Sequence, residues 1–401
     1  MEIVLDVFNY VLVAILIGVS GAWISLIRSM IITFQKSPFL DKFNEKQHSN
    51  PKVSVILPAR NEENFIKKCL DSLLNQNYTN YEIIAIDDSS DDSTGKIIEE
   101  YSKRNSKIIF VKARPKPYDW MGKNWACMEG FRKASGELLL FTDSDTIHSE
   151  NVISLAVSHL FSQDLDVLTV SPKMLCLDRW TKITLPMIST FLHTRFSALR
   201  VNDSNKKTGY FYGSFFIIKK EVYESVGKHE GVKHEIIEDG ALGKKVKESG
   251  FKLRMVRGDH LIDAVWARDL SSLWHALKRL MIPLYLQNRG YAVGIFFAVL
   301  FLLFMPFPLL SYSIIFFNET NSFAFLFFSS LIASLLIYIA AFVESKFLYL
   351  RFTNALLCPV GSFIVVFGFL GGILQAKSKT AVSWRGRSYS MKEYVQDSIQ
   401  V

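Results

Sequence analysis

The feature that most constrains this chain is a set of four long segments that contain no charged residue. They comprise residues 7–27, 290–318, 320–343 and 352–376. Each is at least 21 residues long, and about 20 apolar residues suffice to cross the hydrocarbon core of a bilayer. A helix in the core of a soluble domain rarely runs so long without a charge. The sequence therefore predicts an integral membrane protein, with an N-terminal anchor over residues 1–34 and a C-terminal membrane region over 290–376.

The distribution of basic residues predicts the orientation of the chain in the cell membrane. No basic residue precedes the first apolar segment, whereas Arg28, Lys36, Lys42 and Lys46 follow it. Because Lys and Arg gather on the cytoplasmic side, we expect a multi-pass protein whose N-terminus lies outside and whose soluble domain is cytoplasmic. The acidic start of the chain favours an uncleaved anchor over a signal peptide.

The last apolar segment, 352–376, has basic residues on both flanks and contains one proline and four glycines. Two cytoplasmic flanks are incompatible with a single crossing, and Pro and Gly permit bent or broken helices. We therefore expect a re-entrant or interfacial hairpin here, followed by a cytoplasmic tail over residues 377–401.

The soluble region, residues 50–289, is long enough for one sizeable domain. The formal net charge is +8, which fits a membrane protein with basic cytoplasmic loops, and no basic stripe interleaved with aromatic residues points to nucleic acid. The four cysteines are dispersed and form no Cys-x-x-Cys pair. A zinc knuckle and a disulfide framework are thus excluded.

Short β-branched runs alternate with amphipathic stretches from residue 51 onward. The pattern predicts strands over 53–57, 82–87, 107–111 and 137–143, and helices over 63–75, 91–104 and 124–134. Such alternation is typical of βαβ units and predicts an α/β domain with a mostly parallel sheet. Ligands of these sheets bind at the carboxyl ends of the strands.

Acidic residues cluster at two of these predicted strand ends. Asp87 and Asp88 end the second strand, and Asp143-Ser-Asp145 follows a later one. Two carboxylates two residues apart at such a junction can hold a hard cation, which would offset charge on a diphosphate. A lone Asp-x-Asp is more often a solvated turn, but the second acidic strand end favours a site. His229 and His234 are five residues apart, so they do not form the His-Glu-x-x-His motif of zinc proteases.

Four motifs in order resemble those of the inverting family 2 glycosyltransferases of the GT-A fold. They are Pro58-Ala-Arg-Asn-Glu-Glu63, Asp87-Asp88, Asp143-Ser-Asp145 and Ile237-Glu-Asp239. Residues 120–127, 234–243 and 383–389 are similar to the branch that glycosylates membrane lipids. That branch includes the diaponeurosporenoate, hopene-associated and, more distantly, ceramide glucosyltransferases. The resemblance implies a GT-A fold, a nucleotide-sugar donor and a lipid acceptor.

The resemblance also implies which residues bind the donor. Asp88 would contact the nucleotide base, and Pro58, Arg60 and Glu62 would line the same pocket. Lys123 lies in a segment that faces the donor in similar proteins.

The remaining matched carboxylates would serve the metal and the reaction. Asp143 would approach the ribose or donor sugar and, with Asp145, ligate a divalent cation, Mg²⁺ or Mn²⁺. Asp239 would be the general base that takes the proton of the attacking hydroxyl, with Glu238 beside it as the second candidate.

One departure from the family pattern concerns the Gln-x-x-Arg-Trp motif of processive members, which does not occur before the second apolar segment. The tail residues Trp384, Arg385 and Arg387 are candidates for the missing function, with both arginines binding diphosphate oxygens. The alternative for this tail is a basic patch on anionic lipid headgroups.

Two apolar stretches, 180–199 and 270–286, suit helices lying in the membrane interface, where they would present the acceptor; core-facing helices are the alternative. We expect transfer of one hexose, with glucose as the leading candidate, from a UDP-sugar to a lipid at the cytoplasmic face of the bilayer. The alternatives are a processive polysaccharide synthase, a polyprenyl-phosphate sugar synthase and an inactive nucleotide-binding scaffold.

Overall fold

The computed structural model describes residues 2–42, 50–378, 381–384 and 386–390, which group into two compact units. The α/β unit contains residues 37–175 and 196–266. The helical unit contains, of the described residues, 2–36, 176–195 and those between 267 and 390. The chain therefore leaves the α/β unit for one helix between residues 176 and 195 and then returns to it.

The α/β unit is built on a seven-stranded sheet with the order β3-β2-β1-β4-β8-β6-β9. Its strands are β1 (Val53–Ala59), β2 (Tyr81–Asp87), β3 (Ile108–Lys112), β4 (Leu138–Phe141), β6 (Val167–Ser171), β8 (Phe216–Lys219) and β9 (Leu253–Arg257). Only β8 runs antiparallel to its neighbours β4 and β6. A small second sheet holds β5 (Thr146–His148), β10 (Ile262–Ala267) and β7 (Lys173–Cys176). The predicted α/β fold with a mostly parallel sheet is confirmed.

Helices cover both faces of the large sheet, because side chains alternate across each strand. On one face, Val55 and Leu57 of β1 pack with α2 (Ile66–Leu74), α3 (Thr94–Arg104) and α5 (Val152–Ser162). On the other face, Ile56 packs with α4 (Gly122–Phe131), α8 (Lys220–Ser225) and α9 (Glu238–Glu248). Every residue of β1 and β2 is buried, as expected for central strands of a doubly covered sheet.

Among the described residues, three helices of the helical unit are long and apolar enough to cross a membrane, 3–36, 321–347 and 352–377, or up to four if a bent pair counts as one span. Its elements are α1 (Glu2–Lys36), α6 (Arg179–Arg195), α10 (Leu270–Gln287), α11 (Arg289–Val299), the π-helix η3 (Leu300–Phe304), α12 (Pro306–Ile315), α13 (Asn321–Phe347), η4 (Phe352–Leu357), α14 (Cys358–Ser378), β11 (Ala381–Trp384) and β12 (Arg387–Ser390).

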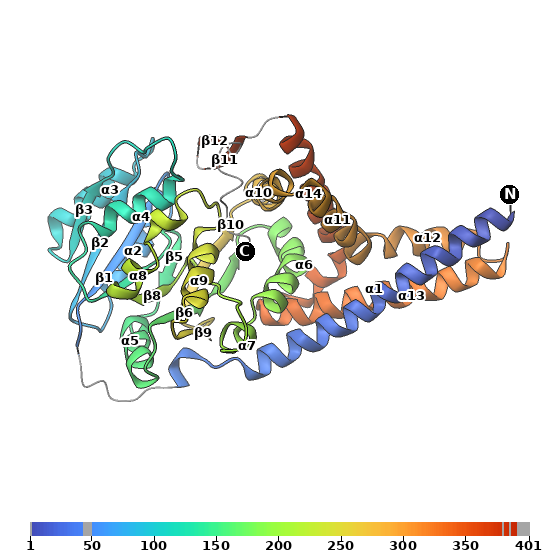
Figure 1. Cartoon of the computed structure of the whole chain (residues 1–401), viewed down its shortest axis with the longest axis horizontal. Helices are drawn as coiled ribbons and strands as arrows, with labels where there is room; N and C mark the ends of the chain where they lie inside the picture. The colour runs from blue at the N-terminus through green and yellow to red at the C-terminus, as the bar shows by residue number, and fades with distance from the viewer. Residues whose placement is uncertain (1, 43–49, 379–380, 385, 391–401) are drawn as a thin grey trace. The chain divides into compact units, whose positions relative to one another are not determined.

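Helices α1 and α13 lie side by side and run in the same direction (Figure 1). At one end, Thr320 and Ser322 donate hydrogen bonds to the Asp6 carboxylate, each over 2.6 Å. At the other end, the rings of Phe34 and Phe347 stack with a centroid separation of 3.4 Å. The start of α13 is therefore at the same end of the pair as the start of α1.

The helix break that was expected in the last apolar segment, 352–376, lies in the second apolar segment, 290–318, instead. Helices 289–304 and 306–315 meet at a bend of 56°, where a π-helix is followed by Pro306, two recognised causes of kinks. The expected hairpin within 352–376 is corrected, because α14 is one uninterrupted helix that does not turn back. Its glycines do not break the backbone; they allow close packing, since a Cβ at Gly361 would lie 2.1 Å from the Ile183 carbonyl oxygen.

Both stretches predicted to lie in the interface, 180–199 and 270–286, are helical and correspond to α6 and α10. Helices α6 and α10 belong to the helical unit, whereas residues 196–199 at the end of the first stretch belong to the α/β unit. Within the soluble domain expected over 50–289, residues 176–195 and 267–289 group with the helical unit, and the bounds of that domain stay a prediction. The interfacial position of α6 and α10 stays a prediction.

Candidate active site

Three neighbouring parallel strands, β1, β2 and β4, end at one edge of the sheet, and the candidate residues follow them. The backbone N–H of Asp88 donates to the Ala59 carbonyl over 2.9 Å, which extends the β1–β2 pairing by one residue. The Arg60 guanidinium donates to the Asp88 carbonyl over 2.7 Å and to the Asp91 carboxylate over 3.1 Å. Arg60 thus holds the Asp88 loop in place, a positioning role that the motif alone does not reveal.

The segment after β1 is tied to the loop after β2 by further bonds. Glu62 donates its backbone N–H to the Thr94 hydroxyl over 2.7 Å, and the N–H of Asn61 donates to the Ser90 hydroxyl over 3.1 Å. Asn61 has a φ of +55°, a conformation that Asn tolerates better than most residues. Pro58, Glu62 and Asp88 are buried in this rim, so the structure brings together the residues predicted to form the nucleotide pocket.

The acidic pair follows β4, and its first residue contacts a lysine from α4. The Lys123 ammonium lies 2.7 Å from the Asp143 carboxylate and 2.6 Å from the Glu238 carboxylate. Lys123 is positioned by the first turn of α4, and Glu238 by the first turn of α9. One half-buried cation thus joins the residue predicted to approach the donor to the pair predicted to contain the base.

Asp239 is held by the loop that precedes β8. The backbone N–H of Gly213 donates to its Oδ2 over 2.9 Å, and the N–H of Gly240 donates to its Oδ1 over 2.8 Å. Residue 213 must be small, because a Cβ there would lie 2.8 Å from Asp239 Oδ2 and 2.9 Å from Lys123 Nζ. The carboxylate is therefore fixed by two backbone donors.

The surroundings of Asp239 change its acidity. Burial, and next the Glu238 carboxylate, raise the pKa of Asp239 to about 7, while Lys123 acts in the opposite direction. A general base is most effective when its pKa is near the working pH. Asp239 therefore combines fixed geometry with the acidity that proton abstraction requires.

A buried network joins the acidic pair to this loop. The Thr142 hydroxyl donates to the Ser214 carbonyl over 2.7 Å and lies 3.0 Å from His148 Nε2. Burial lowers the pKa of His148 to about 4, so the ring is neutral at pH 7 and its Nε2–H donates to Thr142. Thr142 precedes Asp143, and Ser214 follows Gly213, whose backbone holds Asp239. The network therefore fixes the spacing between Asp143 and Asp239.

The acidic pair fits a cation that a diphosphate helps to coordinate. Among the residues that the structure describes, no three His, Cys, Asp or Glu side chains gather as a metal site. Burial is the main cause that raises the pKa of the Cys69 thiol, and the charges of Asp145 and Asp143 raise it further. Both carboxylates therefore lie near Cys69. Mg²⁺ commonly takes one or two carboxylates and completes its shell with water and substrate phosphates, and Mn²⁺ also prefers oxygen ligands. Two carboxylates at a strand end match that donor set.

Two of the three tail residues predicted to bind the diphosphate, Trp384 and Arg387, lie in a β-hairpin of the helical unit. Trp384 pairs with Arg387 across β11 and β12, and Arg385 lies outside the described residues. Their role in donor binding stays a prediction.

Sequence reasoning missed Gly213, Thr142 and His148 as parts of the site. Gly213 lies in the aromatic segment 209–216. The one available signal was the glycine itself, between Tyr212 and Ser214, since glycine can mark a place where another group approaches the backbone closely. Thr142 and His148 carry no motif, because their contacts join segments that are 6 to 72 residues apart.

Comparisons with known proteins agree with this geometry. Residues 54–227 match the family model described as glycosyl transferase family 2. The chain is 30% identical over 159 residues to the probable glycosyltransferase YdaM of Bacillus subtilis, covering 37% of this chain and 37% of that protein. It is 27% identical over 212 residues to the 4,4'-diaponeurosporenoate glycosyltransferase of Staphylococcus haemolyticus, covering 51% of this chain and 55% of that one. The chain thus spans about half or less of the length of these relatives.

A solved structure shares the fold over nearly the whole chain. The mannosyltransferase PcManGT from Pyrobaculum calidifontis, in complex with GDP-Man and Mn²⁺, superposes with a TM-score of 0.52. The match covers 92% of this chain and 99% of that chain at 16% identity. The α/β unit therefore has the GT-A fold.

Proposed function

Because residues 54–227 form a glycosyl transferase family 2 domain, we propose that this chain transfers a single sugar from a UDP-sugar to a membrane lipid. Glucose is the leading candidate for the sugar. The observation that carries the proposal is the partly buried cluster in which Lys123 joins Asp143 to Glu238, next to an Asp239 held by the Gly213 backbone. A protein that only bound nucleotide would not need a carboxylate of raised pKa beside the acidic pair.

The cluster supports an in-line displacement with inversion. The acceptor hydroxyl oxygen forms a bond to the anomeric carbon as the bond from that carbon to the diphosphate oxygen breaks, and UDP leaves. Asp239 accepts the hydroxyl proton, which becomes acidic only as the new bond forms. Asp143 and Asp145 would hold a divalent cation, which supplies positive charge to offset that of the diphosphate.

Lys123 has two tasks in this mechanism. It offsets the negative charges of Asp143 and Glu238, which would otherwise repel an anionic donor. It also keeps the pKa of Asp239 from rising further, so that a useful fraction of the base is ionised at neutral pH. Glu238 is the second candidate for the base, but its contact with Lys123 over 2.6 Å makes it the less available carboxylate.

The apolar helices support a membrane-bound acceptor and a multi-pass topology. Since α13 starts at the same end as α1, a chain that crosses with both helices would return across the membrane between them, and the bent pair 289–315 could supply that crossing. Basic residues after α1 and near the end of α13, such as Lys36 and Arg351, support a cytoplasmic position of the α/β unit. A water-soluble donor and a lipid acceptor would then meet at this face.

The test is a transfer assay with the detergent-purified full-length chain, Mn²⁺, a panel of UDP- and GDP-sugars, and a total lipid extract from the native cell. Mass spectrometry then identifies lipids that have gained sugar mass. We expect one adduct of a single hexose, made from a UDP-sugar. Ladders of repeating sugar mass would instead establish a processive synthase, an adduct on a polyprenyl phosphate would establish that acceptor, and nucleotide binding without any adduct would establish a scaffold.

A further inference from the structure

A second cluster of ionisable side chains lies in the helical unit, at the end of α13. The carboxylate of Glu344 is fully buried and accepts a hydrogen bond from the Ser189 hydroxyl of α6 over 2.8 Å. It also lies 3.0 and 3.1 Å from Nδ1 of His193, one turn further along α6. Ionisable residues in apolar helices are costly and commonly functional.

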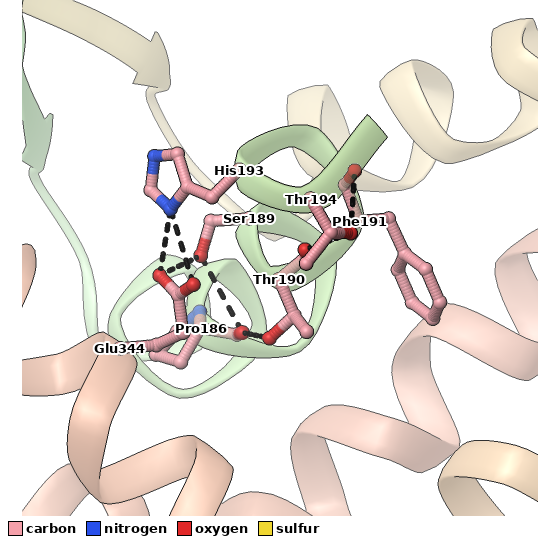
Figure 2. Close-up of polar contacts among 7 residues, drawn as sticks. All are labelled: Pro186, Ser189, Thr190, Phe191, His193, Thr194 and Glu344. Carbon is pink, nitrogen blue, oxygen red and sulfur yellow. Dashed lines mark hydrogen bonds and ion pairs between the residues drawn. The ribbon is translucent and has the colours of Figure 1, made fainter. Parts of the chain in front are cut away.

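Glu344 fixes the orientation of the His193 ring. With Nδ1–H directed at a buried carboxylate, the opposite ring nitrogen, Nε2, points away from Glu344 (Figure 2). The edge of the Phe34 ring meets the imidazole at a centroid distance of 4.8 Å, which restricts the ring further. About a fifth of the His193 side chain remains exposed. The cluster therefore presents one oriented nitrogen on a rigid support.

We propose that the exposed nitrogen of His193 binds the hydroxyl group of a neutral lipid. In the neutral ring Nε2 accepts a hydrogen bond, and in the protonated ring it donates one. A hydroxyl group pairs with both forms, because it can donate and accept. The hydrogen-bonding capacity of the ring thus favours an alcohol, which pairs with both forms, over an ionised phosphate or carboxylate oxygen, which can only accept.

The location of the cluster in the chain suits a lipid headgroup. It lies near the ends of α1 and α13 that carry Lys36 and Lys346, where the helices meet the interface. Three residues after His193 comes Phe196, whose ring stacks on Tyr210 at 4.5 Å. Burial of Tyr210 and, next, the charge of Asp239 raise the pKa of Tyr210. The Tyr210 ring therefore lies within electrostatic reach of the base. In the sequence, His193 is therefore three residues from a ring that packs on this tyrosine.

This inference rests on the proposed function only in identifying the bound lipid as the sugar acceptor. The binding itself can be measured without any transfer. The probes are dioctanoylglycerol, its 3-acetyl ester, which lacks the hydroxyl, and dioctanoyl phosphatidic acid. Native mass spectrometry of the detergent-solubilised full-length chain gives the dissociation constant for each.

We expect the wild-type chain to bind dioctanoylglycerol about tenfold more tightly than the acetyl ester, which is the worth of one buried hydrogen bond. His193→Phe and Glu344→Gln should abolish that preference, the second by releasing the ring. His275→Phe is the matched control, because His275 is an exposed histidine of α10 whose Nδ1 bonds to the Ser271 carbonyl of its own helix. This control should keep the preference.

Equal binding of the alcohol and its ester to the wild-type chain would overturn the proposal, and so would tighter binding of phosphatidic acid. The comparison between ligands needs no variant, so a misfolded substitution cannot hide the answer. Transfer to lipids without a hydroxyl preference would leave the glycosyltransferase in place and remove this site. A hydroxyl preference without any transfer would leave the site and remove the proposed reaction.

Discussion

Lowering the pH from about 8 to about 5 should reduce sugar transfer about 100-fold, because Asp239 must be ionised to accept the proton. Its pKa is raised to about 7, first by burial and then by Glu238. At pH 8 about 90% of such a carboxyl group is ionised, and at pH 5 about 1%. A carboxyl group of ordinary pKa would stay about 90% ionised over the whole range, and the rate would hardly change.

The fall in transfer as the pH is lowered is the acidic limb of the pH–rate profile. Two substitutions should move this acidic limb in opposite directions. Glu238→Gln removes a neighbouring negative charge, so the pKa of Asp239 falls and the limb moves to lower pH. Lys123→Gln removes the positive charge that opposes the shift, so the limb moves to higher pH. The total rate falls in Lys123→Gln, since the lysine also contacts Asp143, but the position of the limb is independent of the maximum rate.

The assay is kcat/KM for the UDP-sugar, measured by lipid mass spectrometry at half-unit steps of pH, with UDP binding measured at each end as a control for folding and donor affinity. A flat profile between pH 5 and 8 would refute the assignment of Asp239 as an ionising base. Shifts of both variants in the same direction would show that the charges of Lys123 and Glu238 do not act on the base as the geometry requires.

Three further predictions concern the metal, the base and the membrane helices. Asp145→Asn should raise the Mn²⁺ concentration needed for half-maximal transfer at least tenfold, as a metal titration would show, whereas an unchanged value would place the cation elsewhere. Gly213→Ala puts a methyl group 2.8 Å from the Asp239 carboxylate, so transfer should fall about 100-fold with UDP binding retained. Gly361→Ala, with its Cβ 2.1 Å from a carbonyl of α6, should lower the melting temperature by several degrees. Gly294→Ala has open space at that position and should not.

The strands and helices that position the donor site could be predicted from the sequence, because local pattern determines them. Buried parallel strands give continuous apolar runs such as residues 53–57, and acidic residues after such runs mark the edge where ligands bind. The nucleotide rim around Arg60 and Asp88 followed from these patterns together with the family motifs. What remained hidden were contacts between distant segments, such as the bond from Gly213 to Asp239, which leave no periodic signal.

The membrane region was harder to predict, because glycine has two opposite uses in an apolar helix. It can break the backbone, which was the expectation for 352–376, or allow another backbone to approach closely, as Gly361 does against α6. Composition does not separate these uses. The pairing of Glu344 with His193 was hidden for a similar reason, since 151 residues separate the two side chains.

The most direct test of the central claim is transfer by Asp239→Asn, which keeps the shape of the side chain and removes the base. We predict that formation of the single-hexose lipid falls by about 10² to 10⁴-fold, while UDP binding stays within about twofold of wild type. Asp71→Asn, at an exposed aspartate on α2, is the matched control and should transfer normally. Normal transfer by Asp239→Asn would contradict the account, because the carboxylate that the structure holds beside Lys123 would then not be the base.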